Sequence, residues 1–348
     1  MQKPFRIISC LLITALGLCA DEPWRTFTDK QGRTIEARVV SVQGDDDQVT
    51  LKLRKSNNNA NVPFSNLSDS DVDFLKTWKP TEADEEADDD KVSKRLYPRT
   101  KKEIKSEISE INKRTPPTGI DRVQQRTVNE LNIYRYVSGV PHDVVADPDM
   151  TKKATDAAKA CKKNGGLSHD LGQSTDICNL AHGSSMFDSI SQYIDDFGDD
   201  NREKRGHRRW CLNPPLGKTG FGEDGDFSAM IALDTSGRDN MKDSWAYPGK
   251  GYFPKEYLHG NCWSLYLTEN APDAKDLKVE VFELSKSPDK PFSMNEEIPG
   301  KALPVKYVTT YINAINFEPQ PEPITNRGIY WVRIKGGGVS ESYLVEIF

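Results

Sequence analysis

The chain has 348 residues, with 47 Lys and Arg against 53 Asp and Glu, so its formal net charge at pH 7 is −6. At roughly 100–200 residues per domain, this length predicts two or three domains. The acidic balance argues against broad nucleic-acid binding, so no nucleic-acid partner is expected. No apolar run of about 18 residues follows the N-terminal segment, which excludes a multi-span membrane protein.

Residues 1–20 have the order of a secretory signal peptide. Lys3 and Arg6 precede a short apolar stretch, and the small residue Ala20 comes just before a polar segment. A charged start, an apolar core and a small final residue are the features of a cleaved export signal. We therefore expect an exported protein (secreted, periplasmic or at the cell surface) with no transmembrane span after signal removal. An uncleaved anchor and a lipid-anchored form are the alternatives.

Removal of this segment leaves four cysteines, Cys161, Cys178, Cys211 and Cys262. In an exported chain, four cysteines permit two disulfides and three connectivities. The pairing of Cys161 with Cys178 is the most local, and it would leave Cys211 to pair with Cys262. Buried free thiols are the alternative to this disulfide prediction.

Residues 21–79 are predicted to form a small β domain. The stretches 34–39 and 49–53 alternate polar with apolar residues, which predicts two strands, and 61–64 predicts a third. Ser68 is placed to cap a short helix that follows these strands.

This segment resembles the SH3-like homology domain first described in an actin-patch endocytic adaptor. The matching residues are Trp24-Arg25-Thr26-Phe27, Gly32 with Ile35-Glu36-Ala37, Val49-Thr50-Leu51, and Val62-Pro63-Phe64 with Leu67-Ser68 and Asp71. The resemblance implies an SH3-like β-barrel that binds protein partners.

Residues 80–118 are predicted to be a charged linker. Seven carboxylates fall within the nine positions Glu82–Asp90, and such a run repels itself and stays disordered. The stretch that follows is mainly basic. Its Ile104, Ile108 and Ile111 share one helical face, which predicts a short solvated helix. A basic arm for an anionic polymer is the alternative.

Residues 119–246 are predicted to combine helices with a small sheet. Helical periodicity begins near Val123 and ends at the Ser138-Gly139-Val140-Pro141 run, and a second helix over 149–163 ends at Gly165-Gly166. A third helix is predicted over 184–197. The stretches 217–222 and 228–233 predict a strand pair, so the pattern favours an α-β-α sandwich.

The same segment resembles the CAP superfamily, also called SCP-like: the cysteine-rich secretory, antigen-five and pathogenesis-related proteins. The motifs, in order, are Leu131-Asn132 with Tyr134-Arg135, Leu167-Ser168-His169, Asn179-Leu180-Ala181-His182-Gly183, and Gly206-His207-Arg208-Arg209 with Leu212-Asn213-Pro214. The resemblance implies a cleft in which two histidines and two acidic residues can hold a divalent cation such as zinc or magnesium.

His169 and His207 match the two histidines of that family, and imidazole nitrogens suit zinc-like ions. The first acidic position is Cys178 in this chain, which departs from the family pattern. The second acidic position has no single match in this chain, and its candidates are Asp196, Asp199 and Glu203.

We assign the ligand cleft to His169, Asn179, His182 and His207, and we name His169 and His207 as conditional metal ligands. The alternative is that both histidines hydrogen-bond loops around the core, as buried polar groups usually must.

Residues 247–348 are predicted to form an immunoglobulin-like β-sandwich. Short alternating strands without helices are typical of such a domain. The predicted strands are 263–267, 277–282, 329–334 and 343–347, with 315–319 as a further candidate. The Gly336-Gly337-Gly338 turn would join the last pair of strands into a hairpin.

Two functions follow from these observations. In the first, an exported multidomain binding protein holds a small or lipidic ligand in the CAP cleft, and its β modules bind a protein or an envelope polymer. In the second, a metal-assisted, peptidase-like hydrolase uses His169 and His207 as metal ligands and a carboxylate such as Glu203 to activate water. His207 and Glu203 are then the catalytic candidates. We favour the non-enzymatic binding protein.

Overall fold

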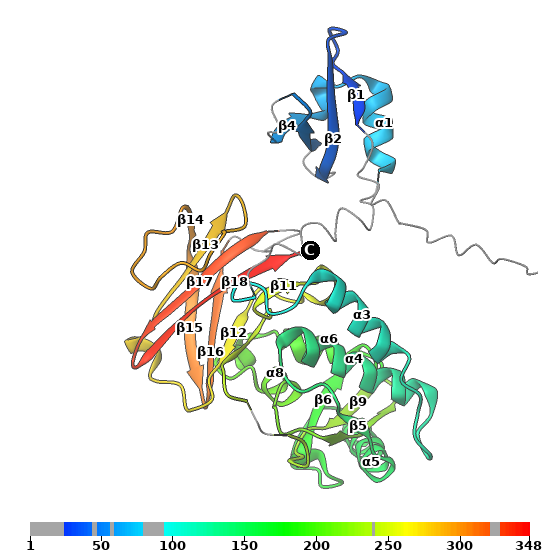
Figure 1. The fold of residues 1–348 in the computed structure, drawn as a ribbon. Coiled ribbons are helices and arrows are strands. Elements are labelled where there is room, and N and C mark those ends of the chain that lie inside the picture. Colours follow the sequence, from blue (N-terminus) through cyan, green and yellow to red (C-terminus); the bar gives the residue numbers. More distant parts are fainter. Residues whose placement is uncertain (1–23, 44–46, 56–58, 79–93, 239–240, 321–327) are drawn as a thin grey trace, which may run out of the picture. The chain divides into compact units, whose positions relative to one another are not determined.

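The structure, a computed structural model, describes residues 24–43, 47–55, 59–78, 94–238, 241–320 and 328–348. The chain divides into two compact units, residues 1–91 and 92–348. The fold is mixed α and β, and none of the described sheets closes into a barrel (Figure 1). The predicted signal peptide and the acidic run 82–90 lie outside the described residues.

The first unit is a four-stranded antiparallel sheet with one helix. Its elements are β1 (Arg25–Thr28), β2 (Thr34–Gln43), β3 (Gln48–Leu53), β4 (Asn59–Pro63) and α1 (Asp69–Thr77). The predicted strands and helix are confirmed, and the side chain of Ser68 caps α1 by accepting a hydrogen bond from the Asp71 backbone N–H. The strands lie in the order β1-β2-β3-β4. This sheet is open, unlike the closed barrel that we predicted.

Helix α3 (Lys101–Asn112) lies inside the segment predicted to be a linker. A capping box defines its start: the Thr100 side chain accepts from the Glu103 N–H, and the Glu103 side chain accepts from the Thr100 N–H. Ile104 and Ile111 are 1% and 0% exposed and belong to the main hydrophobic core. This helix is therefore packed into the second unit, and the expectation of a solvated helix was wrong.

Helices and short strands fill the next part of the second unit. They are α4 (Arg122–Ser138), β5 (Val145–Ala146), α5 (Pro148–Asn164), β6 (Cys178–His182), α6 (Ser189–Asp195), α7 (Asp199–Arg202), α8 (Gly206–Cys211), β7 (Lys218–Thr219), β8 (Phe221–Asp224) and β9 (Phe227–Ile231). As predicted, α4 and α5 end at glycines: Gly139 and Gly165 have φ of +86° and +72°, which a residue without Cβ adopts at little cost. The sheet β6-β9-β8 lies beside α5.

Two further sheets complete the second unit. Their strands are β10 (Trp245–Tyr247), β11 (Gly251–Phe253), β12 (Trp263–Tyr266), β13 (Lys278–Leu284), β14 (Gly300–Leu303), β15 (Val305–Tyr311), β16 (Ala314–Pro319), β17 (Ile329–Gly336) and β18 (Val339–Ile347). Short 3-10 helices are η2 (Phe64–Asn66) in the first unit and η3 (Thr175–Ile177), η4 (Lys255–Tyr257) and η5 (Ala274–Asp276) in the second. The sheet orders are β10-β12-β16-β15 and β11-β18-β17-β13-β14.

These two sheets meet through aromatic side chains. The ring of Trp263 on β12 lies 5.5 Å from the ring of Tyr330 on β17, edge to face. One hydrophobic core runs from Leu96 to Ile347 and includes residues of both the helices and the sheets. β10 lies across the boundary predicted at residue 247 and pairs with β12, so the chain enters the sheets before that boundary.

All four described cysteines are buried free thiols. The structure therefore contains neither of the predicted disulfides, and it agrees with the alternative of free thiols. Burial raises the pKa of the Cys178 and Cys211 thiols to about 12, so both are protonated at neutral pH. Among the described residues, no helix has the length and apolar character needed to cross a bilayer.

The contact between β8 and α5 depends on Gly222. A Cβ at this position would lie 2.2 Å from the backbone N of Thr155. Because backbone cannot yield as a side-chain tip can, we expect Gly222→Ala to lower the free energy of unfolding by about 3 kcal/mol in urea denaturation. Gly166→Ala is the control, since a Cβ there meets nothing within 4 Å. Equal stability of the two variants would contradict this packing.

Candidate functional site

The predicted site residue with the most defined surroundings is His207, in the first turn of α8. Its Nδ1 lies 2.7 Å from Oδ1 of Asp196, and its backbone N–H donates to Oδ2 of the same carboxylate at 2.9 Å. Asp196 follows the last residue of α6 in a left-handed conformation, with φ of 49°. Its side chain is fully buried, whereas that of His207 is 27% exposed. One carboxylate thus caps α8 and orients the imidazole.

Asn179 belongs to the same neighbourhood. Its side-chain Nδ2 donates to the His207 backbone oxygen at 3.1 Å, and its own backbone oxygen accepts from the Tyr193 hydroxyl at 3.1 Å. The Tyr193 ring stacks on the His207 ring with centroids 5.6 Å apart. These contacts join β6, α6 and α8. The Asn179 side chain positions α8 by donating to the backbone oxygen of His207.

The other two predicted histidines have separate partners. Nδ1 of His169 lies 2.8 Å from the backbone oxygen of Thr175, and the Thr175 hydroxyl donates back to the His169 oxygen at 3.0 Å. The His182 ring packs against Phe227, with centroids 4.5 Å apart. Within the described ranges, no hydrogen bond or ring contact joins His169 or His182 to His207. The structure therefore brings together His207 and Asn179 but does not join the two other histidines to them.

The predicted divalent cation finds no matching ligand set. Among the described residues, no group of three or more His, Cys, Asp or Glu side chains is arranged to hold a metal ion. The Cys178 thiol donates to the Ser174 oxygen at 3.1 Å. Glu203 is exposed, and its backbone oxygen accepts from Thr309 and Asn316. Of the three acidic candidates, Asp196 is the partner of His207, whereas the side chain of Asp199 lies outside the described parts.

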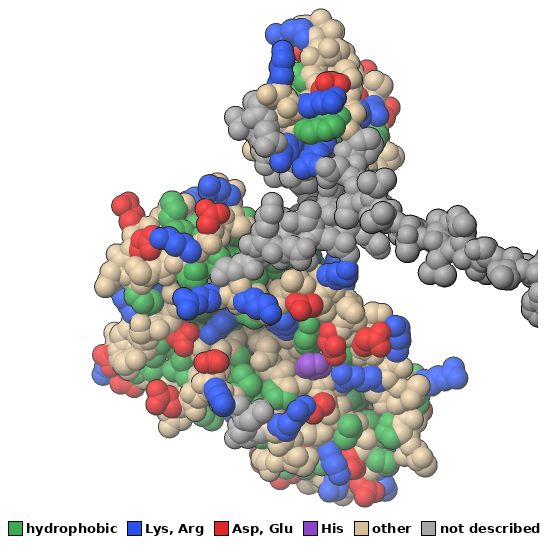
Figure 2. Space-filling model, in the orientation of Figure 1, with side chains coloured by type: hydrophobic (Ala, Val, Ile, Leu, Met, Phe, Trp, Pro, Cys, Tyr) green, Lys and Arg blue, Asp and Glu red, His purple; other side chains and the backbone are tan. Residues whose placement is uncertain are grey.

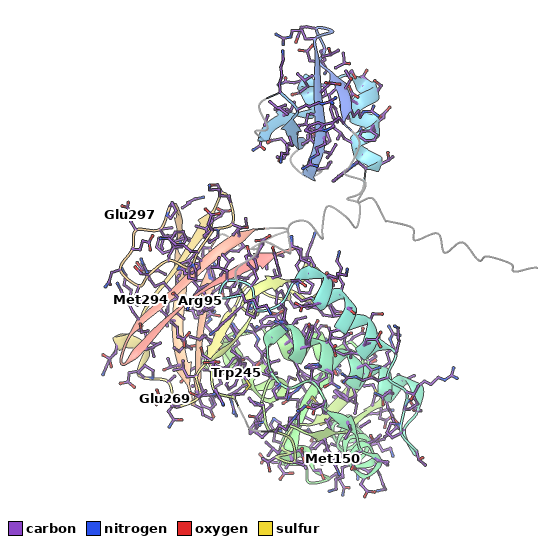
Figure 3. All side chains as sticks on the ribbon, viewed as in Figure 1. Arg95, Met150, Trp245, Glu269, Met294 and Glu297 are labelled. Carbon is purple, nitrogen blue, oxygen red and sulfur yellow. The ribbon has the colours of Figure 1, made fainter. Side chains whose placement is uncertain are left out.

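A different hollow lies where α4 ends and β10 begins. We call it the α4–β10 cleft; its volume is about 760 Å³. The residues that matter most for its chemistry are Arg99, Tyr136, Ser138, His142, Trp245 and Lys250. Figure 3 labels Trp245 where the strands of the second unit meet its helices. The cleft is formed by segments that are far apart in the sequence.

Two basic residues of the cleft are held by defined contacts. The Arg99 guanidinium donates to the backbone oxygens of Tyr136 and Val137, the latter at 3.1 Å, and so caps the C-terminal end of α4. Burial lowers the pKa of Arg99 from its ordinary value. Lys250 Nζ donates to the Ser244 hydroxyl at 2.7 Å and to Oε2 of Glu341 at 3.3 Å. Both cations are therefore held in place before any ligand arrives.

Two neutral donors of the cleft have no partner. The Ser138 hydroxyl and the Trp245 indole N–H are buried, and neither makes a hydrogen bond. The two residues are 2% and 6% exposed, so bulk water does not replace the missing acceptors. An unpaired buried donor costs about 1–3 kcal/mol. Both atoms are closed to solvent, so a ligand in the cleft would recover that energy only when the two side chains turn toward it.

The sequence contained little that would have revealed this cleft. The helix end at Ser138 was predicted from the glycine that follows it, but a serine at a helix end is not itself a binding signal. Trp245 lies just before a turn-rich run and has no recognisable motif around it. The cleft exists only because α4, the segment before α3 and β10 converge in the folded chain.

No family model, no curated protein and no solved structure matches this chain. The resemblances to the CAP superfamily and to the SH3-like homology domain therefore stay predictions.

Proposed function

We propose that this chain is an exported, non-enzymatic binding protein whose second unit, a CAP-like domain followed by a β-sandwich, holds a small or lipidic ligand. We place that ligand in the α4–β10 cleft instead of the predicted histidine cleft. The single observation that carries this choice is a cleft of about 760 Å³ whose wall contains two buried, unpaired donors, Ser138 and Trp245. Small-molecule sites in proteins are typically about 300–1,000 Å³ with a few polar groups in an apolar lining.

The first unit is proposed to bind a protein or an envelope polymer. Trp24 is 38% exposed, and the guanidinium groups of Arg38 and Arg54 each lie 5.7 Å from its ring centroid. Exposed tryptophan and arginine are enriched where proteins bind one another. This arrangement supports a recognition role for the SH3-like unit.

The ligand site is tested by filling the cleft. Met241 lines it and is half-buried, whereas Met294 is equally half-buried and lies elsewhere in the second unit (Figure 3). With the fluorescent probe 1-anilinonaphthalene-8-sulfonate, we expect one saturable site and an affinity loss of at least about tenfold in Met241→Trp, because the indole occupies the ligand's volume. Met294→Trp should bind like the unaltered chain. Absence of saturable binding, or equal binding by all three proteins, would overturn the site.

The hydrolase is the second candidate, and the Asp196–His207 pair favours it because a buried carboxylate orients a partly exposed imidazole. The Nδ1 contacts, to Asp196 in His207 and to the Thr175 oxygen in His169, leave Nε2 of each ring open. What argues against a metal role is that no group of three or more ligating side chains is found among the described residues. We expect calorimetry with zinc chloride to give the same weak signal for the unaltered chain and for the His169→Ala/His207→Ala variant. Stoichiometric zinc binding lost in that variant, together with turnover of a peptide or ester, would favour the hydrolase.

A further inference from the structure

The charge on the walls of the α4–β10 cleft differs in sign from that of the whole chain. The chain carries a formal net charge of −6. The cleft is lined by four basic residues against a single carboxylate, and these are Arg99, Arg238, Lys242 and Lys250 against Asp243. A cationic ligand would therefore meet like charges at close range.

Nearby carboxylates balance only part of this charge. Arg238 pairs with Asp143, but both side chains are more than half exposed, so the pair is screened by solvent. Lys250 pairs with Glu341, and two of its three N–H groups are used by Glu341 and Ser244. The third N–H of Lys250 has no oxygen acceptor among the described residues, and the ammonium lies 5.4 Å from the Tyr343 ring centroid. His142, the imidazole on the same wall, bonds to Glu107 at 3.1 Å, and burial lowers its pKa, which keeps the ring neutral at pH 7.

The neutral donors restrict the chemical class of the ligand further. The Trp245 indole N–H can only donate, and Ser138, whose hydroxyl is also buried and unpaired, lines the same cleft. An entirely apolar ligand would leave both of them unpaired. An oxyanion supplies several acceptor lone pairs and also attracts the ammonium group of Lys250.

The remaining wall is apolar. Pro98, Val140, Pro141 and Met241 line the cleft, together with the faces of Tyr136 and Trp245. The Trp245 ring stacks on the Tyr266 ring, with 5.5 Å between centroids and 10° between planes. On the face of the second unit in Figure 2, acidic and basic side chains are interspersed. That face lacks the single-sign field that attracts a polyanion.

From these four observations we infer that the α4–β10 cleft binds an amphiphilic organic anion, with an apolar ring or acyl body and one carboxylate, sulfonate or phosphate group. The body lies against Met241 and Trp245, and the anionic group accepts a hydrogen bond from Lys250, with Trp245 and Ser138 as further donors once their side chains turn toward it. This inference rests on the proposed function, since it names the ligand class of the same cleft.

The test compares two fluorescent probes that differ by one charged group. The first, 1-anilinonaphthalene-8-sulfonate, carries a sulfonate, whereas N-phenyl-1-naphthylamine has the same rings and none. We expect the full-length mature chain to bind the sulfonate at least about tenfold more tightly, as charge-assisted hydrogen bonds allow. Lys250→Gln should remove most of that difference in affinity. Its affinity for the neutral probe should stay within about twofold of that of the unaltered chain.

Two variants control this experiment. Lys306→Gln also removes a lysine that pairs with a carboxylate, that of Glu318, but this pair lies outside the cleft. The variant should therefore bind both probes with unchanged affinity. Trp245→Phe keeps an aromatic ring and removes the N–H. It should lower the affinity for the sulfonate probe about fivefold and change the affinity for the neutral probe little. Thermal unfolding of each variant checks that the fold is retained.

The outcomes separate the ligand class from the site. If both probes bind equally and Met241→Trp blocks both, the cleft stands and the anion inference is overturned. If neither probe responds to Met241→Trp, the proposed site fails and the anion inference fails with it. If heparin displaces the sulfonate probe far better than a sulfated monosaccharide does, the ligand is a polyanion and the inference is wrong.

Discussion

Arg135→Met is expected to lower the free energy of unfolding by on the order of 4 kcal/mol, because it leaves several buried carbonyl oxygens without a donor. The Arg135 side chain is completely buried in α4. Its Nε donates to the Pro141 oxygen at 2.7 Å, and its Nη1 donates to the Cys211 oxygen at 2.8 Å. The remaining acceptors are the backbone oxygens of Asn213 at 2.8 Å, Pro214 at 3.2 Å and Leu216 at 3.4 Å.

Burial lowers the pKa of Arg135 to about 10, so the guanidinium is still charged at neutral pH. Methionine has a similar reach but no donor, and the loop after α8 would have to open to hydrate its carbonyls. Guanidinium chloride denaturation measures the loss, with the exposed Arg122 of the same helix changed to Met as the control. Arg135→Lys should fall between the two, since an ammonium offers fewer donors in a less suitable geometry. An Arg135→Met variant as stable as Arg122→Met would refute this role.

Arg208→Met is expected to lower the free energy of unfolding by about 3–5 kcal/mol, because it leaves several buried acceptors without their donor. The Arg208 side chain is fully buried and joins the end of α6 to β12. It donates to the backbone oxygens of Ile194 and Asp195, the latter at 3.1 Å, and to the backbone oxygen of Cys262 at 2.8 Å and the Ser264 hydroxyl at 2.9 Å. Its guanidinium also lies 4.6 Å from the Tyr247 ring centroid.

Because these acceptors lie on both sides of the boundary predicted at residue 247, the variant also tests cooperativity within the second unit. Because one core includes both the helices and the sheets, we expect the second unit to unfold in a single calorimetric transition that the variant shifts. Two transitions from residues 92–348 would indicate separate domains. Arg209→Met is the control: its guanidinium stacks at 4.1 Å on Trp210, and its loss should cost about 1 kcal/mol. An unchanged midpoint for Arg208→Met would show that its hydrogen bonds contribute nothing net.

The sequence motifs include two arginines that the fold buries, but they did not indicate which atoms those arginines bind. Arg135 and Arg208 were both singled out in family-like motifs. Each binds backbone carbonyls. Carbonyl partners are invisible in a sequence because every residue has one, and only the folded path of the chain selects which of them converge.

The histidines illustrate the same limit. His207 stays a predicted site residue, and the second acidic position of that site was left open among three residues. Of the three, Asp196 contacts His207, because the left-handed turn after α6 directs its carboxylate to the first amides of α8. Spacing alone could not distinguish Asp196 from its neighbours, since all of them lie within a few positions.

What the sequence determined by itself was the local structure: the alternating strands of the first unit, the start of α1 at Ser68 and the ends of α4 and α5 at glycines. Backbone sterics and capping involve only a few neighbouring residues, so these features are readable along the chain. Tertiary structure alone decided that Ile104 and Ile111 are buried and that Ser138 faces the same cleft as Trp245. Burial and unpaired donors depend on which distant segments pack together, and that choice is made by the whole core at once.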